Sequence, residues 1–129
     1  MKIPDLSQAA EAGVREWSGS PDPLKAAAGT AKLRFALVDL HGIGSKTELM
    51  AALAKGLGLP AHFGNNWDAL ADSVEDSDWL GGHGIVIALR HSKAFGDAHR
   101  ADWSTLSEIL GEAAEYWREL HKPFWVFVA

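Results

Sequence analysis

Five carboxylate side chains lie in one short stretch of the chain, residues 60–80, and no basic residue lies among them. They are Asp68, Asp72, Glu75, Asp76 and Asp78. Between Lys55 and Arg90 there is no lysine or arginine, and the rest of the chain carries as many acidic as basic side chains. The whole formal net charge of −5 therefore comes from this stretch. Such carboxylates are suited to bind cations, to transfer protons or to contact a basic protein.

The acidic stretch has the pattern of a helix over residues 66–75. Gly64 suits a tight turn with positive φ, and the side-chain oxygen of Asn65 or Asn66 is suited to cap the first turn. One apolar stripe recurs at helical spacing, formed by Trp67, Leu70, Ala71 and Val74. A separate acidic face contains Asp68, Asp72 and Glu75, with Asp76 beside them. Glu75 and Asp76 oppose the helix dipole, at about 0.3–1 kcal/mol each, which indicates a purpose other than local stability.

A specific motif surrounds this helix. It reads Phe63-Gly64-x-Asn66-x-Asp68-Ala69-Leu70-x-Asp72, preceded by Leu59-Pro60. The motif resembles the signature of the barstar family of ribonuclease inhibitors, and the order of elements from about Lys32 to Ala129 is compatible with that family. The resemblance implies an inhibitor that is not an enzyme and that blocks the RNA-binding cleft of a basic ribonuclease. An acidic run is otherwise typical of a solvated helix face.

The resemblance also implies which residues contact the partner. Asp72 matches the family's phosphate-mimicking aspartate, and Asp68 matches its neighbouring contact. The predicted partner-binding set is His62, Phe63, Asn66, Asp68, Ala71, Asp72, Glu75, Asp76, Trp79 and Glu115.

Some members of this set depart from the family pattern. His62 replaces an aromatic contact, Ala71 stands where the family has a bulky tryptophan, and Glu75 replaces a smaller residue. Trp79 is either a substitute aromatic contact or a core residue. Glu115 is either a further contact or a solvent-facing glutamate. These departures bear on which partner is bound, since a large aromatic side chain is a frequent hot spot.

The charge balance restricts the partner to a basic molecule. Direct binding to nucleic acid requires a basic face, so we expect a basic ribonuclease or nuclease toxin as the partner and a monomer when free. The alternative is a barstar-fold interaction domain, of the immunity-protein type, that binds a different basic protein. The absence of cysteine, of a signal-peptide pattern and of a membrane-length apolar run predicts a cytoplasmic protein.

Motifs for cofactors, metals and catalysis are missing. The six histidines lack metal-binding spacing, and Asp76-Ser77-Asp78 lacks the rest of a calcium loop. The run His41–Thr47 departs from a phosphate loop, whereas Ser45 and Glu48 fit a capping box. No G-x-S-x-G motif occurs. We therefore expect no metal or organic cofactor, and a small enzyme or nucleotide-binding protein has no motif in its support.

Alternating apolar runs and helical segments predict an α/β fold, barstar-like, with a three-stranded parallel sheet packed with helices. Strands are expected near 33–40, 84–90 and 124–128, and helices near 46–57, 66–75 and 103–120. The last helix should be capped by Asp102 or Ser104 and should include Tyr116 and Leu120 on its apolar face. Residues 1–30 should form a helical extension and linker, with a helix over 6–17, ahead of a barstar-like domain at 31–129.

Overall fold

The computed structural model of the chain describes residues 2–60 and 63–129. The backbone forms a sheet of four parallel strands in the order β1-β4-β3-β2. These are β1 Val14–Glu16, β2 Arg34–Asp39, β3 Ile85–Arg90 and β4 Phe124–Val128. In the register, Ile85 aligns with Arg34 on one side and with Phe124 on the other. The predicted α/β fold with a parallel sheet is confirmed, but the sheet has four strands and not three.

The helical elements agree with the predictions in the middle of the chain. They are η1 Ala9–Glu11, α1 Asp22–Thr30, α2 Lys46–Leu57, α3 Trp67–Val74, α4 Ser77–Leu80, α5 Ser92–Ala98 and α6 Arg100–Glu119. The predictions for α2 and α3 are confirmed to within a residue. The predicted caps of the last helix, Asp102 and Ser104, are wrong because α6 begins earlier and both residues lie within it.

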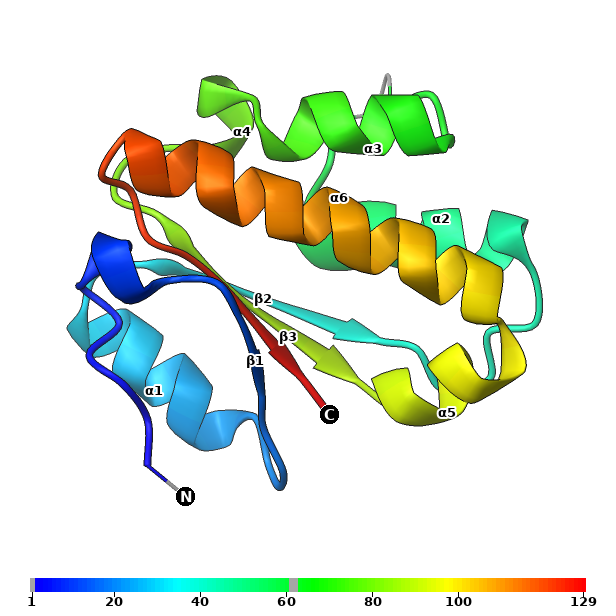
Figure 1. The fold of residues 1–129 in the computed structure, drawn as a ribbon, viewed down its shortest axis with the longest axis horizontal. Helices are drawn as coiled ribbons and strands as arrows, with labels where there is room; N and C mark the ends of the chain where they lie inside the picture. The colour runs from blue at the N-terminus through cyan, green and yellow to red at the C-terminus, as the bar shows by residue number, and fades with distance from the viewer. Residues whose placement is uncertain (1, 61–62) are drawn as a thin grey trace.

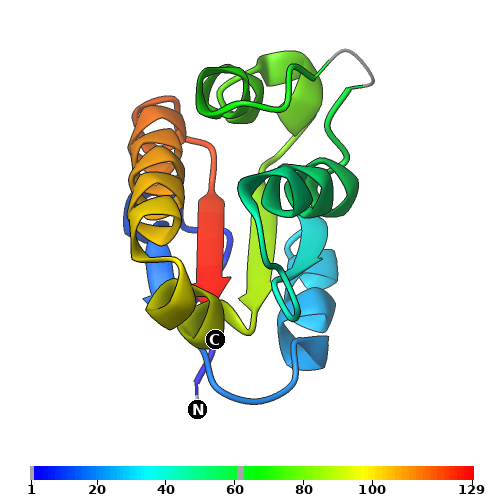
Figure 2. The ribbon, with the colours of Figure 1, turned by 90° about the vertical axis from the view of Figure 1, so that its right-hand side faces the viewer.

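The helices form layers on both faces of the sheet. Figure 1 shows α2 and α6 above the sheet, with α3 and α4 above them, and α1 below the sheet. From the side, α3 and α4 lie above α2 and beside the upper end of α6, past the upper ends of the strands (Figure 2). The main core lies between the sheet and α2, α3 and α6, and it includes Leu53, Leu70 and Trp117. The acidic stretch is therefore on an outer layer supported by packed helices.

The N-terminal segment covers the second face of the sheet. A smaller core there joins Leu6 and Leu24 to Trp125 and Phe127 of β4, and the indole N–H of Trp125 donates to the carbonyl of Leu6 at 2.8 Å. The predicted helix over 6–17 is wrong, because this segment forms the short η1 and then β1, which pairs with β4. A strand partner more than a hundred residues away overrides the local helical composition.

Local sequence signals fix the turn between β2 and α2. Ser45 caps α2, since the N–H of Glu48 donates to its hydroxyl oxygen at 3.1 Å, and a Glu48 carboxylate oxygen accepts from the Ser45 hydroxyl at 3.2 Å. The predicted capping box is confirmed. Later in α2, a Cβ at Gly56 would lie 2.8 Å from the carbonyl oxygen of Leu37. Glycine at this position therefore lets α2 pack closely on β2.

The burial predicted for two residues at the end of α6 is not observed. The predicted apolar face included Tyr116 and Leu120, but these side chains are 40% and 50% exposed. They lie at the edge of the buried stripe of α6, which includes Ala113 and Trp117. Within the described residues, no helix combines the length and the apolar character that crossing a membrane requires.

Candidate functional site

The start of α3 is fixed by asparagine side chains. The N–H of Ala69 donates to the side-chain oxygen of Asn66 at 2.8 Å, and the Asn66 amide donates to the carbonyl of Gly64 at 3.2 Å. Asn65 adopts the left-handed conformation, with φ of 54°. The positive φ predicted for Gly64 thus occurs one residue later, at a residue type that tolerates it better than most. These contacts set the direction in which α3 leaves the loop.

The inner face of α3 is held firmly. Leu70 and Val74 are fully buried, and the indole N–H of Trp117 on α6 donates to the carbonyl of Val74 at 2.8 Å. Asp68 and Asp72, on the other side of the helix, are exposed. Because the buried side cannot rotate without breaking this packing, α3 presents its two aspartates to solvent in a fixed orientation.

A short helix, α4, continues the acidic surface. Asp76 caps it by accepting from the N–H of Asp78 at 2.8 Å, and both residues are exposed. Trp79 is buried, and its indole N–H donates to the carbonyl of Leu57 at 2.8 Å. The guanidinium of Arg34 donates to the Trp79 carbonyl and lies 5.3 Å above the Trp79 ring. Of the two alternatives for Trp79, this structure favours the core residue.

The acidic face is defined here as Asp68, Asp72, Glu75, Asp76 and Asp78. Within the described part of the chain, no lysine, arginine or histidine forms an ion pair with these five carboxylates. Burial raises the pKa of Glu75, and the nearby carboxylates of Glu112 and Asp72 raise it further. The acidic field thus extends from α3 to α6.

Helix α6 adds Glu112 to the acidic face, a residue that the sequence analysis did not predict. Glu112 is close enough to Glu75 to affect its pKa, whereas Glu115, the predicted contact, is exposed one turn further along α6. Only the packing of α3 on α6 brings Glu112 to the acidic face. Helical periodicity places Glu112 on the exposed side, but it does not say which helix lies next to it.

A small hollow lies between α3 and the loop that precedes it. Its volume is about 240 Å³, and it is lined by Pro60, Phe63, Gly64, Ala69, Asp72, Ser73, Asp76 and Trp79. Phe63 and Trp79 are buried aromatics that give it an apolar side, and Asp72 and Asp76 give it a charged one. Ala71 is partly buried against the core. His62, also in the predicted set, lies outside the described residues.

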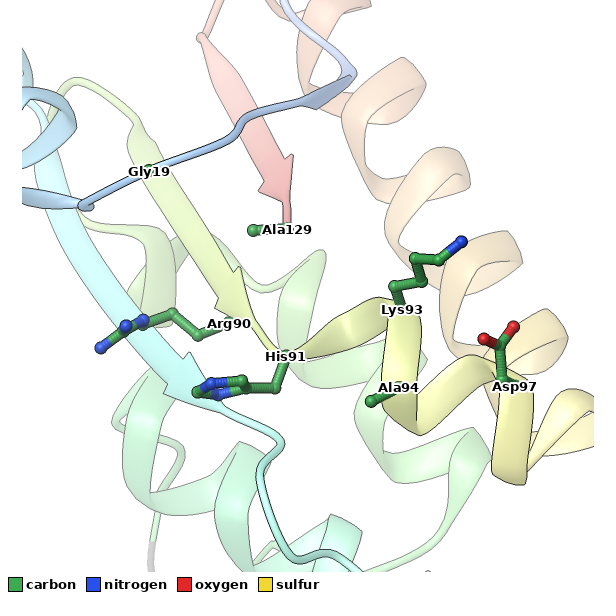
Figure 3. Close-up of a pocket in the computed structure, with 7 residues that line it drawn as sticks. All are labelled: Gly19, Arg90, His91, Lys93, Ala94, Asp97 and Ala129. Atoms are coloured by element: carbon green, nitrogen blue, oxygen red, sulfur yellow. The ribbon is translucent and has the colours of Figure 1, made fainter.

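A second hollow, the strand-end hollow, lies at the carboxyl ends of the strands. Its volume is about 430 Å³, and it is lined by Gly19, Arg90, His91, Lys93, Ala94, Asp97 and Ala129. Ligands of open parallel sheets commonly bind at such an edge. In Figure 3, however, Arg90 and His91 point to one side, whereas Lys93 and Asp97 project from α5 in another direction. These side chains do not converge on one point.

One carboxylate near the strand-end hollow, that of Asp39, is paired within the protein. His91 Nδ1 lies 2.6 Å from Asp39 Oδ1, and the His91 and His41 rings are 5.1 Å apart. The hydrogen bond from His91 lowers the pKa of Asp39, and the backbone N–H of His41 lowers it further. Among the described residues, no group of three or more metal-ligating side chains is placed to hold a metal ion. The described side chains at this edge therefore give no metal site.

Comparison with known families identifies the family of the chain. A family model described as Barstar (barnase inhibitor) matches residues 33–129, which is well over half of the chain. The chain belongs to the barstar family. The matched span contains α3, α4 and α6, whereas η1, β1 and α1 precede it. A search of curated proteins finds no match to the chain.

Membership of the barstar family confirms the resemblance carried by the motif around α3. The description of the family is that of an inhibitor. The family match does not extend to the fourth strand of the sheet, β1, which comes from the preceding residues. Within the matched span, the surface that combines fixed geometry with unbalanced charge is the acidic face of α3 and α4.

Proposed function

We propose that this barstar-family chain inhibits a basic ribonuclease by covering its RNA-binding cleft with the acidic face. The observation that carries the proposal is the pair Asp68 and Asp72, which are exposed and without an ion-pair partner in the described chain. Both project from a helix whose opposite side is fully packed. Carboxylates held in this way can take the places of RNA phosphates opposite arginine and lysine side chains.

Physical chemistry assigns separate roles to the charges. The net charge of −5, concentrated on one face, attracts a cationic cleft over long range and raises the association rate. Asp72, which also lines the small hollow beside α3, is placed to be desolvated against a partner cation. A buried and hydrogen-bonded charge pair slows dissociation, so we expect Asp72 to determine the lifetime of the complex.

A second candidate is an interaction domain of the immunity type that binds a different basic protein or nuclease toxin. Ala71 favours it, because this small side chain on α3 replaces a bulky family aromatic, while Trp79 is buried and hydrogen-bonded to Leu57. Among the described residues, α3 and α4 therefore present carboxylate side chains to solvent but no exposed large aromatic side chain. A changed aromatic set alters specificity more readily than it removes the attraction for a basic protein.

A titration of ribonuclease activity tests the proposal. Increasing amounts of the protein are added to several basic secreted ribonucleases, and RNA cleavage is followed at low and at moderate ionic strength. We expect inhibition of at least one enzyme with a one-to-one end point, weaker at higher salt. If none of the enzymes is inhibited while a basic protein without ribonuclease activity is captured from the native host, the second candidate replaces the first.

A further inference from the structure

Two large apolar side chains are exposed together at the C-terminal end of α6. Tyr116 is 40% exposed and Leu120 is 50% exposed. In the described chain the other exposed large apolar residues are Val14 and Leu37, which lie on β1 and β2 at opposite edges of the sheet. Single exposed apolar residues are normal for a soluble protein. Tyr116 and Leu120 differ because they are one helical turn apart and therefore form one strip.

This strip, Tyr116 with Leu120, continues the acidic face. Glu112 lies one turn before Tyr116 on the same side of α6, and it acts on the pKa of Glu75 at the end of α3. Trp117, next to Tyr116, donates to the carbonyl of Val74, the last residue of α3. Figure 1 and Figure 2 both show α3 and α4 alongside this part of α6. The apolar strip and the carboxylates thus belong to one continuous surface.

The strip is held in place by the way α6 ends. His121 adopts the left-handed conformation, with φ of 59°, and the N–H of Lys122 donates to the carbonyl of Trp117 at 2.9 Å. The ring of Tyr116 packs edge-on against Trp117, with centroids 4.9 Å apart. The buried neighbour limits the conformations available to the Tyr116 ring, and the closed helix end fixes the backbone of Leu120. Little conformational entropy remains to be lost when a partner contacts them.

We infer that Tyr116 and Leu120 form the apolar anchor of the surface by which the chain binds its basic partner. The inference rests on the proposed function and adds a contact that α3 and α4 lack. The exposed face of Tyr116 can stack against an arginine guanidinium, while Leu120 can contact the aliphatic part of a lysine or arginine side chain. Tyrosine is also among the residues enriched at binding hot spots.

The charge around this strip indicates which kind of partner binds there. A second copy of the chain would bring its own uncompensated carboxylates against Glu112 and the acidic face, and like charges at an interface oppose binding. An anionic membrane surface is disfavoured for the same reason. A basic protein surface, in contrast, satisfies Glu112 and the carboxylates of the acidic face and covers the apolar strip at the same time.

Dissociation rates of single variants test the inference with a basic ribonuclease that the unaltered protein inhibits. Tyr116→Ala and Leu120→Ala should each accelerate dissociation by about tenfold, with nearly the same loss at two ionic strengths because the contact is apolar. Leu37→Ala is the matched control, since Leu37 is 40% exposed on β2 and its side chain alternates to the face opposite α6. It should leave the rate unchanged. Thermal unfolding of each variant reports on folding.

The outcomes separate this inference from the proposed function. If Asp72→Ala weakens binding while Tyr116→Ala and Leu120→Ala behave like Leu37→Ala, the apolar anchor is wrong and the inhibitor role stands. If either apolar variant dissociates faster while retaining the unaltered protein's unfolding temperature, the anchor is supported. If the unaltered protein binds no basic ribonuclease, the proposed function fails and this inference fails with it.

Discussion

The acidic face and the strand-end hollow lie at opposite ends of the sheet and treat their charges differently. At the hollow, Asp39 is hydrogen-bonded to His91 and to the backbone of His41. On the acidic face, Asp68 and Asp72 have no ion-pair partner in the described residues. The hollow occupies the edge where parallel sheets commonly bind ligands, yet its side chains diverge (Figure 3). We therefore base the proposed site on uncompensated charge on a rigid support, and not on the general rule for the fold.

The largest effect is expected from a core substitution that lowers stability without changing binding. Trp17 is buried, packs edge-on against Phe127 with ring centroids 6.1 Å apart, and lies two residues before Gly19, which lines the strand-end hollow. Trp17→Ala should lower the free energy of unfolding by about 3–5 kcal/mol, because it leaves a cavity in the core under the sheet. Chemical denaturation measures this loss. Ribonuclease inhibition, assayed at a temperature at which the variant is folded, should be unchanged, and a loss of inhibition there would connect the two regions.

A pair of aspartate variants divides the acidic face into centre and rim. Asp72→Ala should cost about 2–5 kcal/mol of binding free energy, mainly through faster dissociation, because the partner's cation is left buried and unpaired. Asp78→Ala should cost less than about 1 kcal/mol and should act on the association rate and its salt dependence. Surface plasmon resonance at two ionic strengths gives both rates. Small and equal losses would mean that the face is only solvated.

Repulsion within the acidic face should be visible in the stability of the free protein. Burial and the carboxylates of Glu112 and Asp72 raise the pKa of Glu75, so the ionised side chain destabilises the folded state above that pKa. Glu75→Gln should therefore stabilise the protein at neutral pH by about 0.3–1 kcal/mol, the scale of an acid at a helix C-terminus.

The pH dependence identifies the cause of that gain. The advantage of Glu75→Gln should disappear as the pH falls through the ordinary glutamate pKa to about 3, because the glutamate is then protonated in both the folded and the unfolded state. Urea denaturation at a series of pH values measures it. Glu115→Gln, an exposed change on α6, serves as the control and should shift stability little. A gain from Glu75→Gln that persisted at low pH would exclude charge repulsion as the reason.

The smallest effect is expected at the strand-end pair. The hydrogen bond from His91 lowers the pKa of Asp39, so the stabilisation is present above the ordinary aspartate pKa and is lost as the pH falls through the lowered value. Both side chains are nearly half exposed, which limits the loss in His91→Ala to about 0.2–1 kcal/mol at neutral pH. Thermal unfolding at pH 7 and pH 3 checks this, and inhibition should be unaffected at neutral pH.

Local patterns predicted the elements whose signals lie within a few residues. Ser45 and Glu48 form the capping box that opens α2, and Asn66 caps α3 as one of the two expected residues. The apolar runs of β2, β3 and β4 also appear where the sequence places them. In each case the stabilising contact is between near neighbours or follows from a continuous buried run, so the sequence contains the necessary information.

Long-range contacts determined what the sequence could not predict. Val14–Glu16 has a weak local signal and becomes a strand because β4 offers it a partner. The sequence alone does not decide whether Trp79 is a core residue or a surface contact, because its partners, the carbonyl of Leu57 and the guanidinium of Arg34, are distant in the chain. Tyr116 has the helical spacing of a core residue, but its side chain remains exposed because the packing of α3 on α6 does not cover it. These outcomes depend on how helices pack, which periodicity alone does not specify.

Two variants with the same change in net charge test the central claim most directly. Asp68→Asn with Asp72→Asn removes two charges from α3, and Asp39→Asn with Asp97→Asn removes two charges beside the strand-end hollow. Association and dissociation rates with an inhibited ribonuclease are measured for both at two ionic strengths. We predict that the α3 variant loses inhibition through slower association and much faster dissociation, while the strand-end variant keeps its dissociation rate. Equal losses in both variants would show that net charge alone governs binding, and would contradict the role of the acidic face.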